Sequence, residues 1–200
     1  PEAPVVEPSA QESLSSWQGV AVSPGIAIGP ARRFEPLAPP VTRRIVSDPA
    51  AEWERLQAAR QTTRQQIEAT HTRLLQQGAR AEAAIFDAHL LFLDDPVLLE
   101  PAQEAIFNQA VNAEAAWDDV IETMAASYAA LDDPYLRARA ADVRDVGRQV
   151  QLALAGARPV FHLDTPAILV ADDLAPSDTA NLDRAKVLGL ITARGGATSH

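Results

Sequence analysis

The residues best suited to chemistry are the last six of the chain, Gly195-Gly196-Ala197-Thr198-Ser199-His200. They follow Lys186–Ala193, a short, mostly apolar run with β-branched residues, which is typical of a buried strand. A strand, a glycine turn and a Thr-Ser pair that can cap a helix would place His200 at a helix N-terminus, where free N–H groups and the helix dipole favour an anion. The pattern predicts a histidine that contacts a bound phosphoryl group. The alternative is a helix-capping turn that happens to contain a histidine.

An imidazole in such a place could act as a nucleophile toward phosphorus. It is uncharged near neutral pH, and a phosphoryl group on nitrogen stays reactive enough to be passed on. Phosphoryl transfer through a loose, in-line transition state needs positioning and charge stabilisation more than acid–base catalysis.

The composition excludes several classes of function. A chain of 200 residues with 47% apolar side chains can build one large domain or two small ones. Its formal net charge of −10 argues against binding to nucleic acid or anionic membranes and favours a basic protein partner. The chain has no cysteine, its four histidines are scattered, and no apolar run approaches the roughly 20 residues that span a bilayer. We therefore expect a soluble, cytoplasmic protein without a metal site in this chain.

The first 34 residues differ in pattern from the middle of the chain. Residues 1–16 are rich in Pro, Glu, Ser and Ala without periodicity, so we expect a linker and an upstream module in a longer polypeptide. Residues 17–34 alternate β-branched and small side chains around Pro24-Gly25, a pair suited to a type II turn. This alternation predicts two short strands joined by a tight bend.

A helical pattern occupies the next hundred residues. Asp48-Pro49 is typical of a helix start, and the sequence Leu-Asp-Asp-Pro at 93–96 and again at 131–134 predicts two further starts. The five expected helices run from Pro49 to Gln77, from about Arg80 to Asp94, from Pro96 to about Gln109, from Asn112 to Leu131 and from Pro134 to Gly156. Short connections between them predict an antiparallel bundle.

Strand patterns return after the helices. Ala167–Ala171 reads as a buried strand, residues 176–182 as a short helix and Lys186–Ala193 as another strand. The predicted fold class is therefore α/β plus all-α: an antiparallel helical bundle inserted into a truncated α/β domain. The expected division is a linker at 1–16, the first part of the α/β domain at 17–47, the helical domain at 48–156, and the incomplete second part of the α/β domain at 157–200.

At this point the chain resembles one family, the N-terminal half of enzyme I of the bacterial phosphoenolpyruvate-dependent sugar phosphotransferase system. Six stretches in the family's order carry the resemblance from about Trp17 onward. They are Gly19–Gly29, Ala84–His89, Asp132–Leu136, Arg139–Gly147, Leu174–Thr179 and Gly195–His200.

The resemblance implies a swivelling phosphohistidine domain interrupted by a helical domain that docks the small carrier protein HPr. By the motif match, His200 takes a phosphoryl group from phosphoenolpyruvate bound to a separate C-terminal barrel and passes it to a histidine of HPr. Thr179 occupies the position of a hydroxyl that contacts this histidine, and it could orient the ring by hydrogen bonding to one nitrogen. The alternative role of Thr179 is helix capping. The family's Mg²⁺ site belongs to the barrel, so no cofactor is expected in this chain. The full-length protein is expected to be a homodimer.

For the HPr-binding surface we single out Leu91, Phe92 and Leu98, because the second helix has one apolar face more than a bundle core needs. Burial in the bundle core is the alternative for each of them. Arg139 matches a family position near HPr; its alternative is a salt-bridged solvated face shared with Asp142, Arg144, Asp145 and Arg148. His89 matches a family histidine, but we assign it a structural role.

The chain departs from the family in one respect. The family tends to carry acidic residues around the apolar docking patch, whereas Arg80, Pro96 and Val97 occupy some of those places here. We therefore expect docking to depend less on salt than usual, as in a protein whose HPr is fused upstream. The Pro-rich segment at 1–16 also favours such a fused multiphosphoryl transfer protein.

Two other functions stay open from the residues. The first is the swivelling domain of a pyruvate phosphate dikinase or phosphoenolpyruvate synthase, which carries a similar Thr-Ser-His motif. The inserted bundle and the Ser-Pro-Gly segment at 23–25 argue against it. The second is a non-catalytic regulatory module that uses the helical domain as a protein-binding surface.

Overall fold

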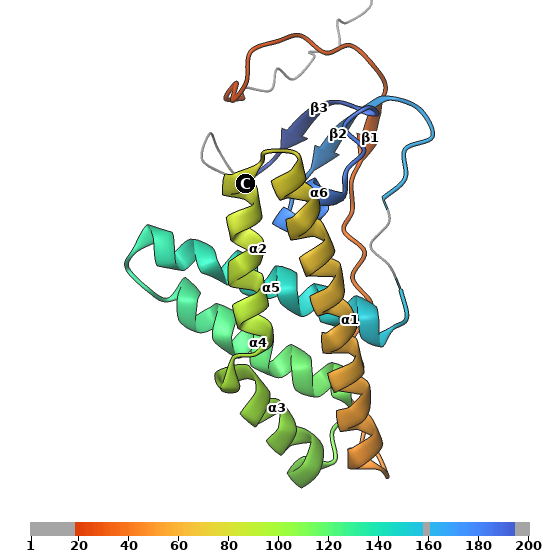
Figure 1. The fold of residues 1–200 in the computed structure, drawn as a ribbon, viewed down its shortest axis with the longest axis vertical. Helices are drawn as coiled ribbons and strands as arrows, with labels where there is room; N and C mark the ends of the chain where they lie inside the picture. The colour runs from red at the N-terminus through yellow and green to blue at the C-terminus, as the bar shows by residue number, and fades with distance from the viewer. Residues whose placement is uncertain (1–18, 158–160, 195–200) are drawn as a thin grey trace, which may run out of the picture.

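The computed structural model describes residues 19–157 and 161–194, which form a helical part and a small α/β part (Figure 1). The helical part contains α1 Pro49–Gln76, α2 Arg80–Leu93, α3 Pro96–Gln109, α4 Ala113–Ala129 and α5 Pro134–Leu154. The α/β part contains β1 Ala31–Arg33, β2 Ala167–Ala171, α6 Pro176–Asn181 and β3 Val187–Thr192. The predicted fold class is confirmed, since the five helices lie between β1 and the two later strands of one sheet.

The helices begin where the Asp-Pro pairs predict. The side chains of Asp48, Asp95 and Asp133 each accept a hydrogen bond from a backbone N–H in the first turn of α1, α3 and α5. Proline then takes the first helical position, where its missing N–H costs nothing. Gly78 and Gly156 follow the ends of α1 and α5 with φ of +77° and +65°, a conformation that glycine adopts without strain.

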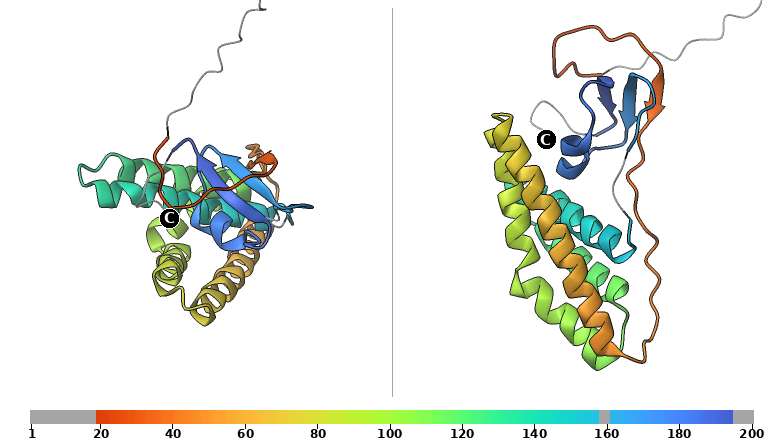
Figure 2. Two further views of the ribbon diagram at one scale, coloured as in Figure 1. Left: turned by 90° about the horizontal axis from the view of Figure 1, so that it is seen from above. Right: turned by 45° about the vertical axis from the view of Figure 1, so that its right-hand side comes forward.

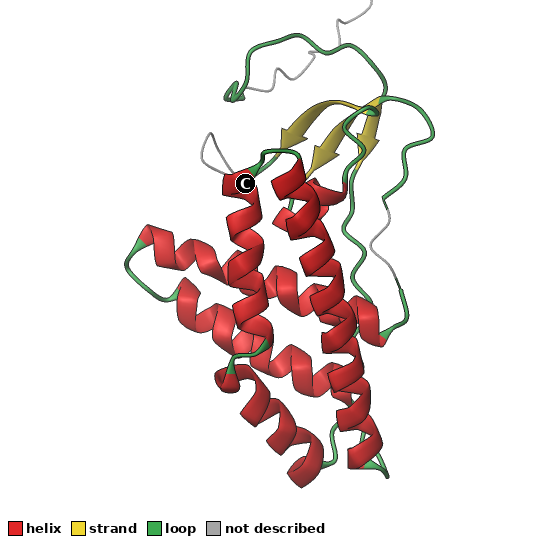
Figure 3. Cartoon of the chain, in the orientation of Figure 1, coloured by secondary structure: helices red, strands yellow, loops and turns green. Residues whose placement is uncertain are grey.

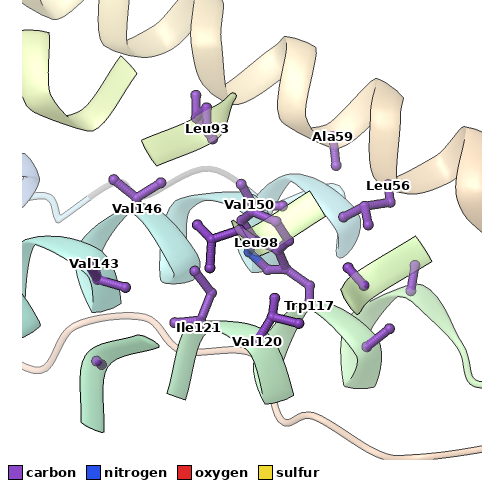
Figure 4. Packing of buried hydrophobic residues seen from close by; sticks show 14 of the residues in the cluster. Leu56, Ala59, Leu93, Leu98, Trp117, Val120, Ile121, Val143, Val146 and Val150 are labelled. Atoms are coloured by element: carbon purple, nitrogen blue, oxygen red, sulfur yellow. The ribbon is translucent and has the colours of Figure 1, made fainter. Parts of the chain in front are cut away.

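The five helices pack in two layers. α1 and α2 run side by side in opposite directions, while α4 and α5 form a second antiparallel pair that crosses them (Figures 1 and 2). The core between the layers centres on Trp117 of α4, with Leu56, Leu98, Val143 and Val150 fully buried around it (Figure 4). The indole Nε1 of Trp117 donates to the carbonyl oxygen of Gly147 at 3.3 Å, which satisfies the one polar atom of this side chain.

The strands form a three-stranded parallel sheet in the order β1-β2-β3. Leu169 in the middle strand pairs with Arg32 on one side and with Leu190 on the other. The connection from β2 to β3 carries α6, as a parallel crossover requires. The sheet lies beyond one end of the α1–α2 pair, and α6 lies between the sheet and the bundle (Figure 2).

The prediction of two strands in residues 17–34 is wrong for the described residues 19–34. Only Ala31–Arg33 pairs with β2, and residues 19–30 form a loop in which Val20, Ile26 and Ile28 are 85%, 93% and 89% exposed. An extended segment becomes a strand only when a neighbour pairs with its backbone groups. No other described strand lies beside residues 19–30 in the sheet order.

A long loop, residues 34–48, leads from the sheet along the bundle to the start of α1 (Figure 3). Near its end, the N–H of Val46 donates to the carbonyl of Ala110 and the N–H of Arg44 donates to the side chain of Asn112. Asn112 holds this loop instead of capping α4 with its side chain. Glu52 of α1 takes over that role, because its carboxylate accepts from the N–H of Ala113 at 2.9 Å.

Candidate functional site

The first turn of α6 is fixed by a buried ionic cluster that reaches from α5. The carboxylate of Asp145 accepts hydrogen bonds from both the N–H of Ser177, at 3.0 Å, and its hydroxyl, at 2.5 Å. Nη2 of Arg148 donates to Asp145 at 2.9 Å, to the Ser177 hydroxyl at 2.9 Å and to Asp178 at 2.8 Å. The side chains of Asp145, Arg148 and Asp178 are only 0%, 14% and 7% exposed. One guanidinium therefore lies between two carboxylates and ties α5 to α6.

The cluster shifts the pKa of Asp178 and of Arg148. Burial raises the pKa of Asp178, and the negative charge of Asp145 adds to this while Arg148 opposes it. Burial alone would lower the pKa of Arg148, but the two carboxylates raise it above its ordinary value. Arg148 thus stays charged and supplies the positive charge that the two buried carboxylates need.

Thr179 lies in the same short helix, directly after this cluster. Its hydroxyl donates to the carbonyl of Pro176 at 3.0 Å, a contact within its own turn. The side chain is only partly buried, and the hydroxyl oxygen can still accept a hydrogen bond from a further donor. His200 lies outside the described residues, so the contact between Thr179 and His200 stays a prediction.

The three apolar residues chosen for docking separate in the structure. Leu91 of α2 is 74% exposed, whereas Phe92 is partly buried against Tyr128 of α4, with ring centroids 6.3 Å apart. Leu98 is fully buried in the bundle core, because it lies on the inner face of α3. The choice of Leu98 as a surface residue is therefore wrong, and the core alternative holds for it. Leu91 and Phe92 remain candidates.

Arg139 lies on α5, near the tip of the α4–α5 pair. Its Nη1 donates to Asp142 at 2.9 Å, and its guanidinium carbon lies 4.7 Å from the centre of the Tyr135 ring. Burial alone would raise the pKa of Asp142, but the nearby His89 and Arg139 hold it below its ordinary value. The side chain of Arg139 is 24% exposed, so it could contact a partner from this position.

The solvated-face alternative for the polar residues of α5 is wrong for Asp142 and Asp145. Each is 2% exposed, in contrast to the Arg144–Glu122 pair, which lies at the surface. Sequence reasoning missed the ionic cluster because its two halves are about thirty residues apart. The sequence did hold one indication that these two residues are buried. Asp142 and Asp145 directly precede Val143 and Val146, which belong to the buried apolar stripe of α5.

His89 is fully buried in α2, as its structural assignment requires. Its ring lies edge-on to Phe86, with centroids 5.2 Å apart, and neither ring nitrogen has a hydrogen-bond partner among the described residues. No group of three or more metal-ligating side chains is found in 19–157 and 161–194. In those ranges, no helix has the length and apolarity to cross a membrane.

Comparisons with known proteins give the chain a family. The family described as PEP-utilising enzyme, N-terminal, matches residues 18–139, and the family described as PEP-utilising enzyme, mobile domain, matches residues 163–200. The phosphoenolpyruvate-protein phosphotransferase of Geobacillus stearothermophilus is 42% identical over 185 residues, which are 91% of this chain and 32% of that protein. The protein of the same name from Bacillus subtilis (strain 168) is 38% identical over 94% of this chain and 33% of its own length.

Solved structures agree with these relatives. An NMR solution structure of enzyme I (nEIt) matches with a TM-score of 0.72 and 36% identity, covering 89% of this chain and 73% of that one. A structure described as the N-terminal domain of Enzyme 1 - Nitrogen matches with a TM-score of 0.65 and 30% identity, covering 89% and 74%. This chain spans about a third of the length of the curated relatives it matches. It belongs to the PEP-utilising enzyme family, as a homologue of the N-terminal domain of enzyme I.

Proposed function

We propose that this chain is the phosphoryl-carrying region of a phosphoenolpyruvate-protein phosphotransferase of the sugar phosphotransferase system. The observation that carries the proposal is the 42% identity to a protein of that name over 91% of the chain. The family match to the mobile domain extends to His200, which supports the histidine of the last motif as the proposed phosphoryl acceptor. In full length the protein is a cytoplasmic homodimer, and phosphoenolpyruvate and Mg²⁺ bind on its C-terminal barrel.

The proposed reaction has two transfers. An imidazole nitrogen of His200 attacks the phosphorus of phosphoenolpyruvate, an N–P bond forms as the P–O bond breaks, and the released enolate takes a proton to become pyruvate. A histidine of HPr then attacks the same phosphorus, and the N–P bond to His200 breaks. Thr179 holds the His200 ring by accepting one hydrogen bond from a ring N–H, which leaves the other ring nitrogen free to react.

The proposed HPr-binding surface consists of Leu91 and Phe92 on α2 and Arg139 on α5. Its support is that Leu91 is 74% exposed on the outer face of α2. Covering this apolar side chain with a partner would stabilise the complex, because apolar surface leaves water. Arg139 adds a charged group, whose guanidinium donates to Asp142 in this structure and could donate to an acceptor of the partner in the complex. The net charge of −10 favours a basic partner in the approach to this surface.

The test uses the intact protein, with whatever segments flank these 200 residues, and HPr phosphorylated with ³²P on its histidine. Wild-type protein should acquire an acid-labile label, and His200→Ala should acquire none. His162→Ala is the matched control and should label normally, because the side chain of His162 is 70% exposed and its Nε2 lies 3.8 Å from Oδ1 of Asp164. A label that persists in His200→Ala, or labelling that requires ATP, contradicts the proposal; ATP-dependent labelling favours the dikinase alternative.

A further inference from the structure

Two arginines of the bundle hold α6 from opposite ends. Arg148 of α5 binds the first turn through Ser177 and Asp178. Arg73, in the last turn of α1, donates to the carbonyl of Ala180 at 2.8 Å and to the side chain of Asn181 at 3.4 Å. We call Arg73, Asp145 and Arg148 the α6 clamp.

The clamp matters because apolar packing does little to place α6. The buried apolar residues of the bundle form one cluster, and those of the α/β part form two separate small clusters. Among the described residues of α6, Ala180 is the one that packs against the bundle cluster, and it is only partly buried. A six-residue helix also has little stability of its own. Directional hydrogen bonds therefore fix how α6 lies against the bundle.

The bonds of the clamp are suited to precise placement. Each involves a charged group, and charge-assisted hydrogen bonds are about twice as strong as neutral ones. Asp145 accepts from two donors of Ser177, which restricts both the position and the rotation of the first turn. Thr179 lies between the residues that Arg148 holds and those that Arg73 holds. Its hydroxyl therefore has a defined place relative to the bundle.

We infer that the α6 clamp acts in phosphoryl transfer, with Asp145, Arg148 and Arg73 as positioning residues for Thr179. The inference rests on the proposed function, in which Thr179 orients the phosphoryl-accepting histidine. A misplacement of about 1 Å at a distance from the chemistry can cost roughly a hundredfold in rate. The clamp thus sets the rate of transfer without contacting HPr or the phosphoryl group.

The first test measures transfer from phospho-HPr to the intact protein in single turnovers, together with HPr affinity. Arg148→Met should slow transfer at saturating HPr by about tenfold or more, with the Kd changed by less than about twofold. Arg148→Lys, which keeps the charge, should recover part of the rate. Arg144→Met is the matched control, because Arg144 lies four residues earlier on α5 and pairs with Glu122 at the surface. It should leave the rate unchanged.

The second test observes α6 directly by amide hydrogen exchange. The N–H of Ser177, which donates to Asp145, should exchange at least about tenfold faster in Arg148→Met and Asp145→Asn, while the amides of α4 keep their protection. If Arg148→Met does not fold, Arg73→Gln tests the other end of the clamp with the same two measurements. Faster exchange with a wild-type transfer rate overturns the inference, as does unchanged exchange. Absence of transfer in wild-type protein refutes the proposed function instead.

Discussion

Gly147 of α5 lies directly against Ile121 of α4. A β-carbon at position 147 would be 2.5 Å from Cγ2 of Ile121 and 2.9 Å from its Cγ1, closer than carbon atoms can pack. The same residue accepts the hydrogen bond of the Trp117 indole through its carbonyl oxygen. The packing of α5 against α4 at this point therefore depends on the absence of a side chain at position 147.

Gly147→Ala should lower the free energy of unfolding by about 1–3 kcal/mol, because the overpacking outweighs the gain in helix propensity. Denaturant unfolding followed by circular dichroism measures this change. Ile121→Ala removes both clashing atoms, so the double variant should be less destabilised than the sum of the two single changes. Strict additivity would contradict the contact.

Thr63→Val should raise the free energy of unfolding by about 1 kcal/mol. The Thr63 side chain of α1 is fully buried, and its hydroxyl has no hydrogen-bond partner among the described residues. Valine keeps the shape and removes the unsatisfied group. The matched control is Thr62→Val on the same helix, where the exposed hydroxyl donates to Ala58. Thr62→Val should change stability by less than about 0.5 kcal/mol, and an equal gain from both variants would refute the argument.

Asp142→Asn should lower stability at neutral pH and reduce its loss in acid. The pKa of Asp142 is depressed in the folded state, so the unfolded chain binds the proton more tightly. The ionised carboxylate therefore stabilises the fold above the ordinary pKa of about 3.9, and this contribution is lost as pH falls through the lower folded pKa. We expect a loss of about 1–3 kcal/mol at pH 7 that shrinks below about pH 4, measured by urea unfolding. Asp132→Asn, at an exposed position, is the control and should change stability at pH 7 by less than about 0.5 kcal/mol.

Leu91→Ala and Leu98→Ala should affect different properties, HPr binding for the first and stability for the second. Leu91→Ala should weaken HPr binding by about 1–2 kcal/mol and leave stability within about 0.5 kcal/mol, since its side chain is 74% exposed. Leu98→Ala should cost about 2–5 kcal/mol of stability, since it leaves a cavity in the core. Isothermal titration with HPr and thermal unfolding give the two quantities. Unchanged binding in Leu91→Ala would remove this residue from the docking surface. Added salt should weaken binding only slightly.

The sequence predicted those elements that depend on local interactions. Asp48-Pro49 and Asp133-Pro134 determine helix starts through contacts within one turn, so the observed starts agree with the prediction. Residues 19–30 could not be predicted in the same way, because a strand needs a partner that the segment itself does not supply. The bounds of β2 and β3 were predictable, because both are short apolar runs between turns.

The candidate site was less predictable than the fold. Thr179 and Arg139 were found through the resemblance, whereas the contact between Asp145 and Ser177 joins helices that are far apart in the sequence. Periodicity places Asp145 near the buried stripe of α5 but does not show what it meets there. The exposure of Leu91 and the burial of Leu98 likewise depend on how α2 and α3 pack on the other helices.

The central claim is that His200 carries the phosphoryl group, and mapping the phosphorylated residue tests it most directly. The intact protein is incubated with phosphoenolpyruvate and Mg²⁺, digested at neutral to alkaline pH and analysed by tandem mass spectrometry. The account predicts one acid-labile phosphate on the imidazole of His200, absent in His200→Ala and formed more slowly in Arg148→Met. A phosphate on any other residue, or none at all on folded, intact wild-type protein, would contradict it.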